Sequence, residues 1–162
     1  MQARKRIEVV RDKARHHPME EIKMPVRATG RSAAYDFFSP EECVLHPGAK
    51  HMFFTDLKVR LESDIRLGER RLMEEFILSP RSSAGIKLNL MLSNTIGLVD
   101  PDYFGCKDND GNIGISVFNY GAETVTIKKG DRFAQGIVVL SVVDEGDEPE
   151  AERTGGMGST GR

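Results

Sequence analysis

The chain has 162 residues, of which 39% are hydrophobic, and a formal net charge of −2. This length suits one domain with a sizeable core, and the hydrophobic fraction excludes a largely disordered chain. The balanced charge gives no general argument for nucleic-acid binding. Because no apolar run is long enough to span a bilayer and the start lacks the apolar stretch of a secretory signal, we expect a soluble, intracellular (cytoplasmic) protein.

Charge gathers at the two ends of the chain. Basic residues crowd the start: Arg4, Lys5, Arg6, Arg11, Lys13 and Arg15. Acidic residues crowd the stretch 144–152, ahead of a Gly-rich end. The basic stretch could contact nucleic acid or form a solvated extension, and we favour the extension. We therefore predict a basic N-terminal extension at residues 1–23, a β domain at 24–143, and an acidic linker with a Gly-rich arm at 144–162.

Between these ends, the sequence has the pattern of short strands separated by turns. Apolar residues alternate at period two over 53–61, 113–118 and 124–127, and an almost continuous apolar run at 136–143 predicts a fully buried strand. Gly-containing turn pairs punctuate the chain: Pro47-Gly48, Asp110-Gly111, Tyr120-Gly121 and Gly130-Asp131. The pattern predicts an all-β fold, as a sandwich or a jelly-roll-like barrel.

Three segments interrupt the strand pattern. The charged stretch 61–78 could be a hairpin or a short helix, and both interpretations stay open. Residues 82–90 predict a short helix with Ser82 or Ser83 near its N-cap. In residues 107–112, Asp108 and Asp110 suggest a calcium loop, but its other ligands are missing, so we expect a solvated hairpin tip.

Some segments could carry chemistry by themselves. Asp100 and Asp102 flank a proline where a strand should end and a hairpin tip begin, and an acid held there could accept a proton from water. A helix start after Pro80 would offer backbone N–H groups to an anion. The Gly-rich end could approach phosphate oxygens closely, with Arg153 as a cationic fork. Taken alone, the first is an ordinary Pro-Asp turn and the last a flexible tail.

Five such segments occur in a fixed order along the chain. They are residues 28–36 (ATGRSAAYD), 80–83 (PRSS), 97–105 (GLVDPDYFG), 130–135 (GDRFAQ) and 153–161 (RTGGMGSTG). At these residues the sequence resembles the trimeric dUTPase family, which is marked by five motifs in this order. One motif is weak evidence, but all five in order are specific. The resemblance covers residues 24–161 and implies a dUTPase-like distorted jelly roll with one short helix and a C-terminal arm.

The resemblance implies roles for the residues of a nucleoside site. Asp100 matches the carboxylate that activates water, and Tyr103 matches a tyrosine that packs on deoxyribose and leaves no room for a 2′-hydroxyl. The hairpin that includes Gly97 would bind uracil through main-chain groups. Asn94 matches an asparagine near the nucleoside, although a turn-forming role is an equal alternative.

The resemblance also implies a triphosphate site. The matched residues are Arg81, Ser82, Ser83, Gln135, Arg153, Met157, Gly158 and Ser159. Arg81 could instead pair with an acid in the core. Asp36 would reach a Mg²⁺ ion through water, and the ion would sit mostly on phosphate oxygens. Three departures from the family pattern are Ala34 and Ser83 in place of glycines and Met157 in place of a phenylalanine that stacks on uracil. We expect looser closure of the arm because Met157 would cover a base less rigidly than an aromatic ring.

The implied function is hydrolysis of dUTP to dUMP and pyrophosphate, by Mg²⁺-assisted attack of water on the α-phosphate with Asp100 as the general base. The resemblance also implies a homotrimer in which the C-terminal arm reaches a neighbouring subunit. Two alternatives remain. One is a dCTP deaminase, or a bifunctional deaminase–dUTPase, on the same fold. The other is a non-catalytic, dUTPase-like regulator that binds a protein partner.

Overall fold

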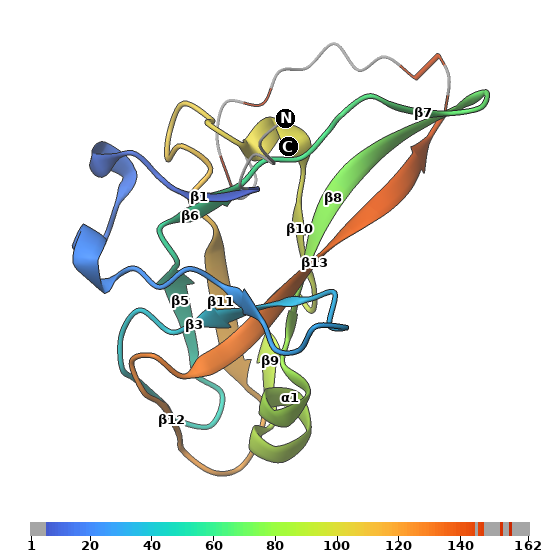
Figure 1. Ribbon diagram of the computed structural model, residues 1–162. Helices are drawn as coiled ribbons and strands as arrows, with labels where there is room; N and C mark the ends of the chain where they lie inside the picture. Colours follow the sequence, from blue (N-terminus) through green and yellow to red (C-terminus); the bar gives the residue numbers. More distant parts are fainter. Residues whose placement is uncertain (1–5, 145, 148–152, 154–155, 157–162) are drawn as a thin grey trace.

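A computed structural model describes residues 6–144, 146–147, 153 and 156 of the chain. Strands curled around one core provide most of the regular secondary structure of this part, which confirms the predicted all-β, jelly-roll-like architecture (Figure 1). The strands are β1 (Ile7–Val9), β2 (Val26–Arg27), β3 (Tyr35–Phe38), β4 (Cys43–Leu45), β5 (Lys50–Phe54), β6 (Leu57–Val59), β7 (Ile65–Leu67), β8 (Arg70–Pro80), β9 (Leu90–Leu92), β10 (Gly97–Val99), β11 (Gly114–Asn119), β12 (Val125–Ile127) and β13 (Arg132–Val143). The helices of this part are η1 (Asp12–Ala14), η2 (Met19–Glu21), α1 (Ser82–Leu88) and η3 (Pro101–Tyr103). None of these helices is long and apolar enough to cross a bilayer.

Two long antiparallel strands, β8 and β13, organise the fold. They pair from Ala134 opposite Pro80 to Val143 opposite Arg71 and cross the whole molecule in Figure 1. β10 flanks β8 on one side, and β3 and β2 continue the sheet beyond β13. At the far end of the ribbon β7 pairs with β8. The charged stretch that could have been a hairpin or a helix is therefore a hairpin.

The core lies between this sheet and the β5–β11–β9 sheet. Phe76 of β8 is fully buried, and its ring meets Phe37 edge-on with centroids 6.0 Å apart. A Cβ at position 136 would come within 2.2 Å of the Phe76 ring, so a glycine is required where β13 crosses it. The predicted alternation is confirmed, since Phe53, Ile115 and the other period-two positions face the core.

The prediction that residues 136–143 form a fully buried strand is wrong. Leu140 is 58% exposed and Val142 is 64% exposed. The two-stranded ribbon extends past the core at this end, as Figure 1 shows, so the outward side chains of β13 have no layer above them within the described part of the chain. An unbroken apolar run cannot distinguish a strand covered on both faces from one that is covered on a single face.

The N-terminal residues are part of the fold. β1 pairs with β6, and Val10 is 3% exposed, so the expectation of a solvated extension is wrong for residues 7–10. Further along, the fully buried Asp56 accepts hydrogen bonds from the backbone N–H groups of His16 and His17 at 2.9 and 2.8 Å. Burial raises the pKa of Asp56, but these bonds and others outweigh it and hold this pKa below its ordinary value. The boundary at residue 23 stays a prediction.

Candidate functional site

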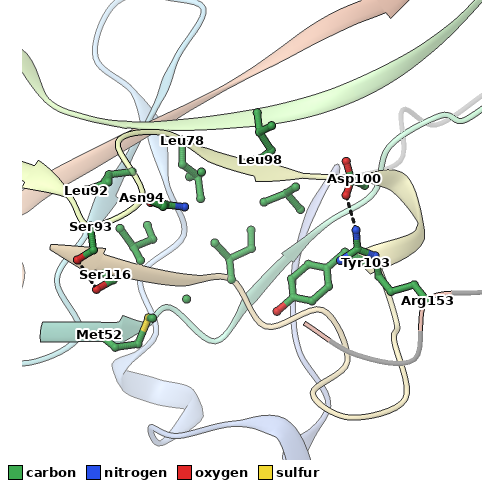
Figure 2. A pocket seen from close by; sticks show the side chains of 15 residues that line it. Met52, Leu78, Leu92, Ser93, Asn94, Leu98, Asp100, Tyr103, Ser116 and Arg153 are labelled. Atoms are coloured by element: carbon green, nitrogen blue, oxygen red, sulfur yellow. Dashed lines mark hydrogen bonds and ion pairs between the residues drawn. The ribbon is translucent and has the colours of Figure 1, made fainter. Parts of the chain in front are cut away.

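A cavity of 490 Å³ opens between β10 and β11 (Figure 2). Its walls are mainly apolar, and polar groups lie at its two ends. Ser93 and Asn94 stand at one end, and Asp100, Tyr103 and Arg153 stand at the other. Because β10 is the edge strand of its sheet, it can present unpaired main-chain N–H and C=O groups to a ligand. Such a cavity suits a flat, polar-edged ring.

Glycine lets the cavity wall sit close to the core. A Cβ at position 97 would lie 3.1 Å from both Cβ and Cδ1 of Leu78, which faces Gly97 across the β10–β8 ladder. A side chain there would push β10 away from β8 or into the cavity. Gly97, expected to help bind the base, thus lies on the cavity wall.

Asp100 stands at the end of β10, half-buried at the mouth of the cavity. The following proline suits the first position of a helical turn, and η3 begins there with Asp100 as its N-cap residue. The expected hairpin tip at Pro101-Asp102 is therefore wrong. β10 pairs with β8, and β11 pairs with β5 and β9, so a helical turn rather than a two-strand hairpin separates them.

The carboxylate of Asp100 pairs with Arg153 and lies near two other acids, Asp102 and Glu75. Arg153 forms ion pairs with Asp100 and, from Nε at 2.7 Å, with Oδ1 of Asp102. Burial raises the pKa of Asp100, Arg153 lowers it, and Asp102 and Glu75 raise it, so that the pKa lies above its ordinary value. A carboxylate with a raised pKa is a stronger proton acceptor.

Tyr103 is buried beside Asp100, with its ring on the cavity wall. Its hydroxyl donates a hydrogen bond to the main-chain oxygen of Asn112 at 2.7 Å and accepts one from Nδ2 of Asn109 at 2.8 Å. The prediction of a solvated tip at 107–112 is thus wrong for its second half, where Asp110 is 4% exposed and Asn112 is fully buried. Sequence reasoning missed Asn109, because Asn, Asp and Gly are also the residues of an ordinary turn.

The remaining predicted residues lie together at another place. Asp36 on β3 is 3% exposed and forms ion pairs with Nε of Arg81 at 3.0 Å and an Nη of Arg132 at 3.2 Å. Gln135, opposite Asp36 in the ladder, donates to Ser79 Oγ at 3.3 Å. Arg81 is the N-cap of α1, so the helix begins at Ser82, and the serines at its first two positions are exposed.

The two groups of residues lie far apart within one chain. Val99 faces Phe76 across the ladder, which puts Asp100 level with Glu75, whereas Ser82 follows the other end of β8. At about 3.3 Å per strand residue, roughly 20 Å separates Asp100 from Ser82. Figure 1 shows η3 and α1 at opposite ends of the molecule. Apart from Arg153, the predicted phosphate residues that the structure describes therefore lie away from the predicted nucleoside residues of the same chain.

Of the predicted Gly-rich arm at 153–161, the structure describes Arg153 and Gly156. Besides Arg153, Gly156 lies against Tyr103, where a Cβ would stand 2.9 Å from the hydroxyl. Met157, Gly158 and Ser159 lie outside the described residues. In this chain the start of the arm therefore touches the residues at the mouth of its own cavity.

Over most of its length, this chain is similar to proteins of one family. The family model described as dUTPase matches residues 20–161. A deoxyuridine 5′-triphosphate nucleotidohydrolase of Lactococcus lactis is 36% identical over 142 residues, which is 86% of this chain and 89% of the relative. The enzyme of the same name from Hahella chejuensis is 34% identical, over 87% of this chain and 88% of its own.

Solved structures give the same result. The crystal structure of dUTPase from Streptococcus mutans superposes with a TM-score of 0.69 at 27% identity and covers 88% of this chain and 100% of its own. A mutant of the dUTPase from phage phi11 of S. aureus, described with a structural Mg(II) ion, shares the fold with a TM-score of 0.61 at 23% identity, over 90% and 95% of the two chains. From the family model, the curated relatives and the fold together, this chain belongs to the dUTPase family of hydrolases.

Proposed function

We propose that this protein hydrolyses dUTP to dUMP and pyrophosphate, with Asp100 as the general base. Membership of the dUTPase family supports the reaction. The observation that carries the residue assignment is the position of Asp100, half-buried at the mouth of the cavity beside Tyr103. No other acid lines that cavity among the described residues.

The cavity offers a physical basis for choosing deoxyuridine. Uracil would bind along the main chain of β10, on a wall that includes Gly97 and Gly114. Cytosine reverses the donor and acceptor at two ring positions and would leave buried groups unpaired, which is costly. The methyl group of thymine would need extra space. The buried ring of Tyr103 would pack on the sugar and exclude a 2′-hydroxyl.

In the proposed reaction, water attacks the α-phosphate, Asp100 accepts the proton of that water, and pyrophosphate leaves. The raised pKa of Asp100 suits this role. Arg153 must release Asp100 first, because a carboxylate in a direct ion pair is a weaker base. The guanidinium would then contact a phosphate, for which its planar fork of donors is suited.

Mg²⁺ is the proposed cofactor. Asp36 has its two oxygens in ion pairs with Arg81 and Arg132, so it would reach a cation only through water. The described residues contain no group of three or more His, Cys, Asp and Glu side chains that could hold a metal. This donor set fits an ion that keeps its waters and is bound mainly by the triphosphate. When bound, Mg²⁺ would offset part of the triphosphate charge.

A homotrimer in which chains share their sites is also proposed. Asp100 and Ser82 are roughly 20 Å apart along β8 by strand geometry, which is too far for both to serve one phosphate chain. A second copy could supply Ser82, Gln135 and their neighbours to the cavity of the first. The C-terminal arm would reach a neighbouring subunit in the same assembly.

A pyrophosphate-release assay tests the proposed function. It would compare dUTP, dCTP, dTTP and UTP, each with and without Mg²⁺. We expect strong preference for dUTP and dependence on the cation. Ammonia release from dCTP would indicate a deaminase instead, and the absence of turnover on any of the four nucleotides would favour a non-catalytic regulator.

A further inference from the structure

The hydroxyl of Tyr103 is held from two sides by one loop. This loop, residues 104–112, is called the Tyr103 loop below. The hydroxyl donates its only hydrogen to the main-chain oxygen of Asn112 at 2.7 Å and accepts a hydrogen from Nδ2 of Asn109 at 2.8 Å. Two bonds in different directions fix the far end of the ring, whereas one bond would still allow the ring to tilt.

Asn109 is itself held in place. Its Oδ1 accepts hydrogen bonds from Sγ of Cys106 at 2.9 Å and from the N–H of Gly111 at 3.1 Å, so its amide can point only one way. Gly111 has φ +80°, and a Cβ there would come within 2.5 Å of the main-chain oxygen of Tyr103. The Tyr103 loop is therefore wrapped tightly around the tyrosine.

The other partner of the hydroxyl is anchored to the core. Asn112 is fully buried, and its Nδ2 donates to the main-chain oxygen of Ala14 at 2.9 Å and to Oδ1 of Asp56 at 2.8 Å. Its Oδ1 accepts the N–H of Asp56 at 2.9 Å. Asp110 is tied down by Nζ of Lys58 at 2.8 Å. A fully satisfied buried network of this kind holds its members rigidly.

We propose that Asn109 is a positioning residue that sets the tilt of the Tyr103 ring and thereby the discrimination between deoxyribose and ribose. The inference rests on the proposed function, because it assumes that the ring packs on the sugar of dUTP. Asn109 does not line the cavity, so it acts through the tyrosine hydroxyl. Its loss would free the ring to move aside and make room for a 2′-hydroxyl.

The test measures kcat and KM for dUTP and UTP separately. For Asn109→Ala we expect the ratio of the two kcat/KM values to fall by about three- to tenfold, the effect of one net hydrogen bond. The fall should arise mainly from a lower KM for UTP. Asp108→Ala, an exposed position in the same loop, should leave the ratio unchanged.

Two further variants separate positioning from folding. Tyr103→Phe removes the hydroxyl, so adding Asn109→Ala to it should change the ratio no further. Asn109→Asp keeps an acceptor for Cys106 and Gly111 but lacks the amide donor, so it should preserve the loop and still lower the ratio.

The outcomes distinguish this inference from the proposed function. If the unmodified protein shows no preference for dUTP over UTP, the proposed function fails. If the preference is present and Asn109→Asp, folded with an unchanged melting temperature, retains it in full, the inference is overturned. Equal losses from Asn109→Ala in the presence and absence of the tyrosine hydroxyl would overturn it too.

Discussion

The two ends of β8 hold two different kinds of polar site. At the β10 end, Asp100 stands half-exposed at the mouth of a 490 Å³ cavity. Arg153 pairs with it and lowers its pKa, whereas the neighbouring acids raise that pKa. At the α1 end, Asp36 is buried and neutralised by Arg81 and Arg132. In the first arrangement, the Asp100 carboxylate can exchange Arg153 for another partner. In the second arrangement, the Asp36 carboxylate holds the guanidinium groups of Arg81 and Arg132 in place.

The difference suggests that the two ends bind different parts of the nucleotide. The α1 end presents positive charge and exposed hydroxyls, which suit phosphates. The β10 end presents a cavity with a half-buried carboxylate, which suits the proposed nucleoside and its reacting water. Roughly 20 Å separates the two ends in one chain, so the proposed joint action of both ends on one nucleotide requires ends from different copies. Four predictions test this comparison, from the largest effect to the smallest.

Asp100→Asn should lower turnover of dUTP by about two to four orders of magnitude, the usual contribution of a general base. Binding of dUTP should persist, since the amide has nearly the same shape, and calorimetry can measure it. Asp102→Asn is the matched control, because it shares Arg153 but stands 58% exposed. It should lower turnover far less, and near-normal turnover of Asp100→Asn would refute the assignment.

Mixed assemblies should recover activity that neither parent has. Asp100→Asn and Ser82→Ala chains, co-expressed with different tags and purified through both, would combine intact halves from different copies. In a cyclic trimer that carries both tags, about a third of the shared sites would combine an intact Asp100 with an intact Ser82 from another copy, and steady-state turnover would reveal them. If each site were built from a single chain, mixing would restore nothing.

Asp36→Ala should destabilise the fold by about 3 kcal/mol, because it leaves two guanidinium groups beside a site that is largely buried. Thermal unfolding at a fixed protein concentration would measure the loss. Asp12→Ala removes a carboxylate that is 88% exposed and pairs with Arg15, so it should leave the midpoint unchanged. Similar losses in both variants would contradict the contrast between a buried and an exposed pair.

The acid limb of kcat/KM should move in opposite directions in two variants. Arg153 lowers the pKa of Asp100 and Asp102 raises it. The base must be ionised to act, so activity rises with pH through this pKa. Arg153→Gln should therefore shift the limb to higher pH, and Asp102→Asn should shift it to lower pH. Movement of both limbs in the same direction would show that another group controls the profile.

Much of this protein follows from its sequence. Alternation at residues 53–61 and 113–118 predicted strands correctly, because a sheet covered on one face requires period two. The motif order led to the family, and the family model and relatives confirmed it. Three local predictions failed where burial depends on distant residues. These are the solvated extension, the fully buried strand at 136–143 and the solvated tip at 107–112.

Only the tertiary structure decided which residues meet. The sequence determined that Asp100 is an acid beside a proline and that Asn109 is a turn residue. It could not show that Arg153 would reach Asp100, that Asn109 would hold the hydroxyl of Tyr103, or that Ser82 would lie at the far end of β8. The physical reason is that local propensity depends on neighbours along the chain, whereas ion pairs and buried hydrogen bonds depend on how the strands are paired in space.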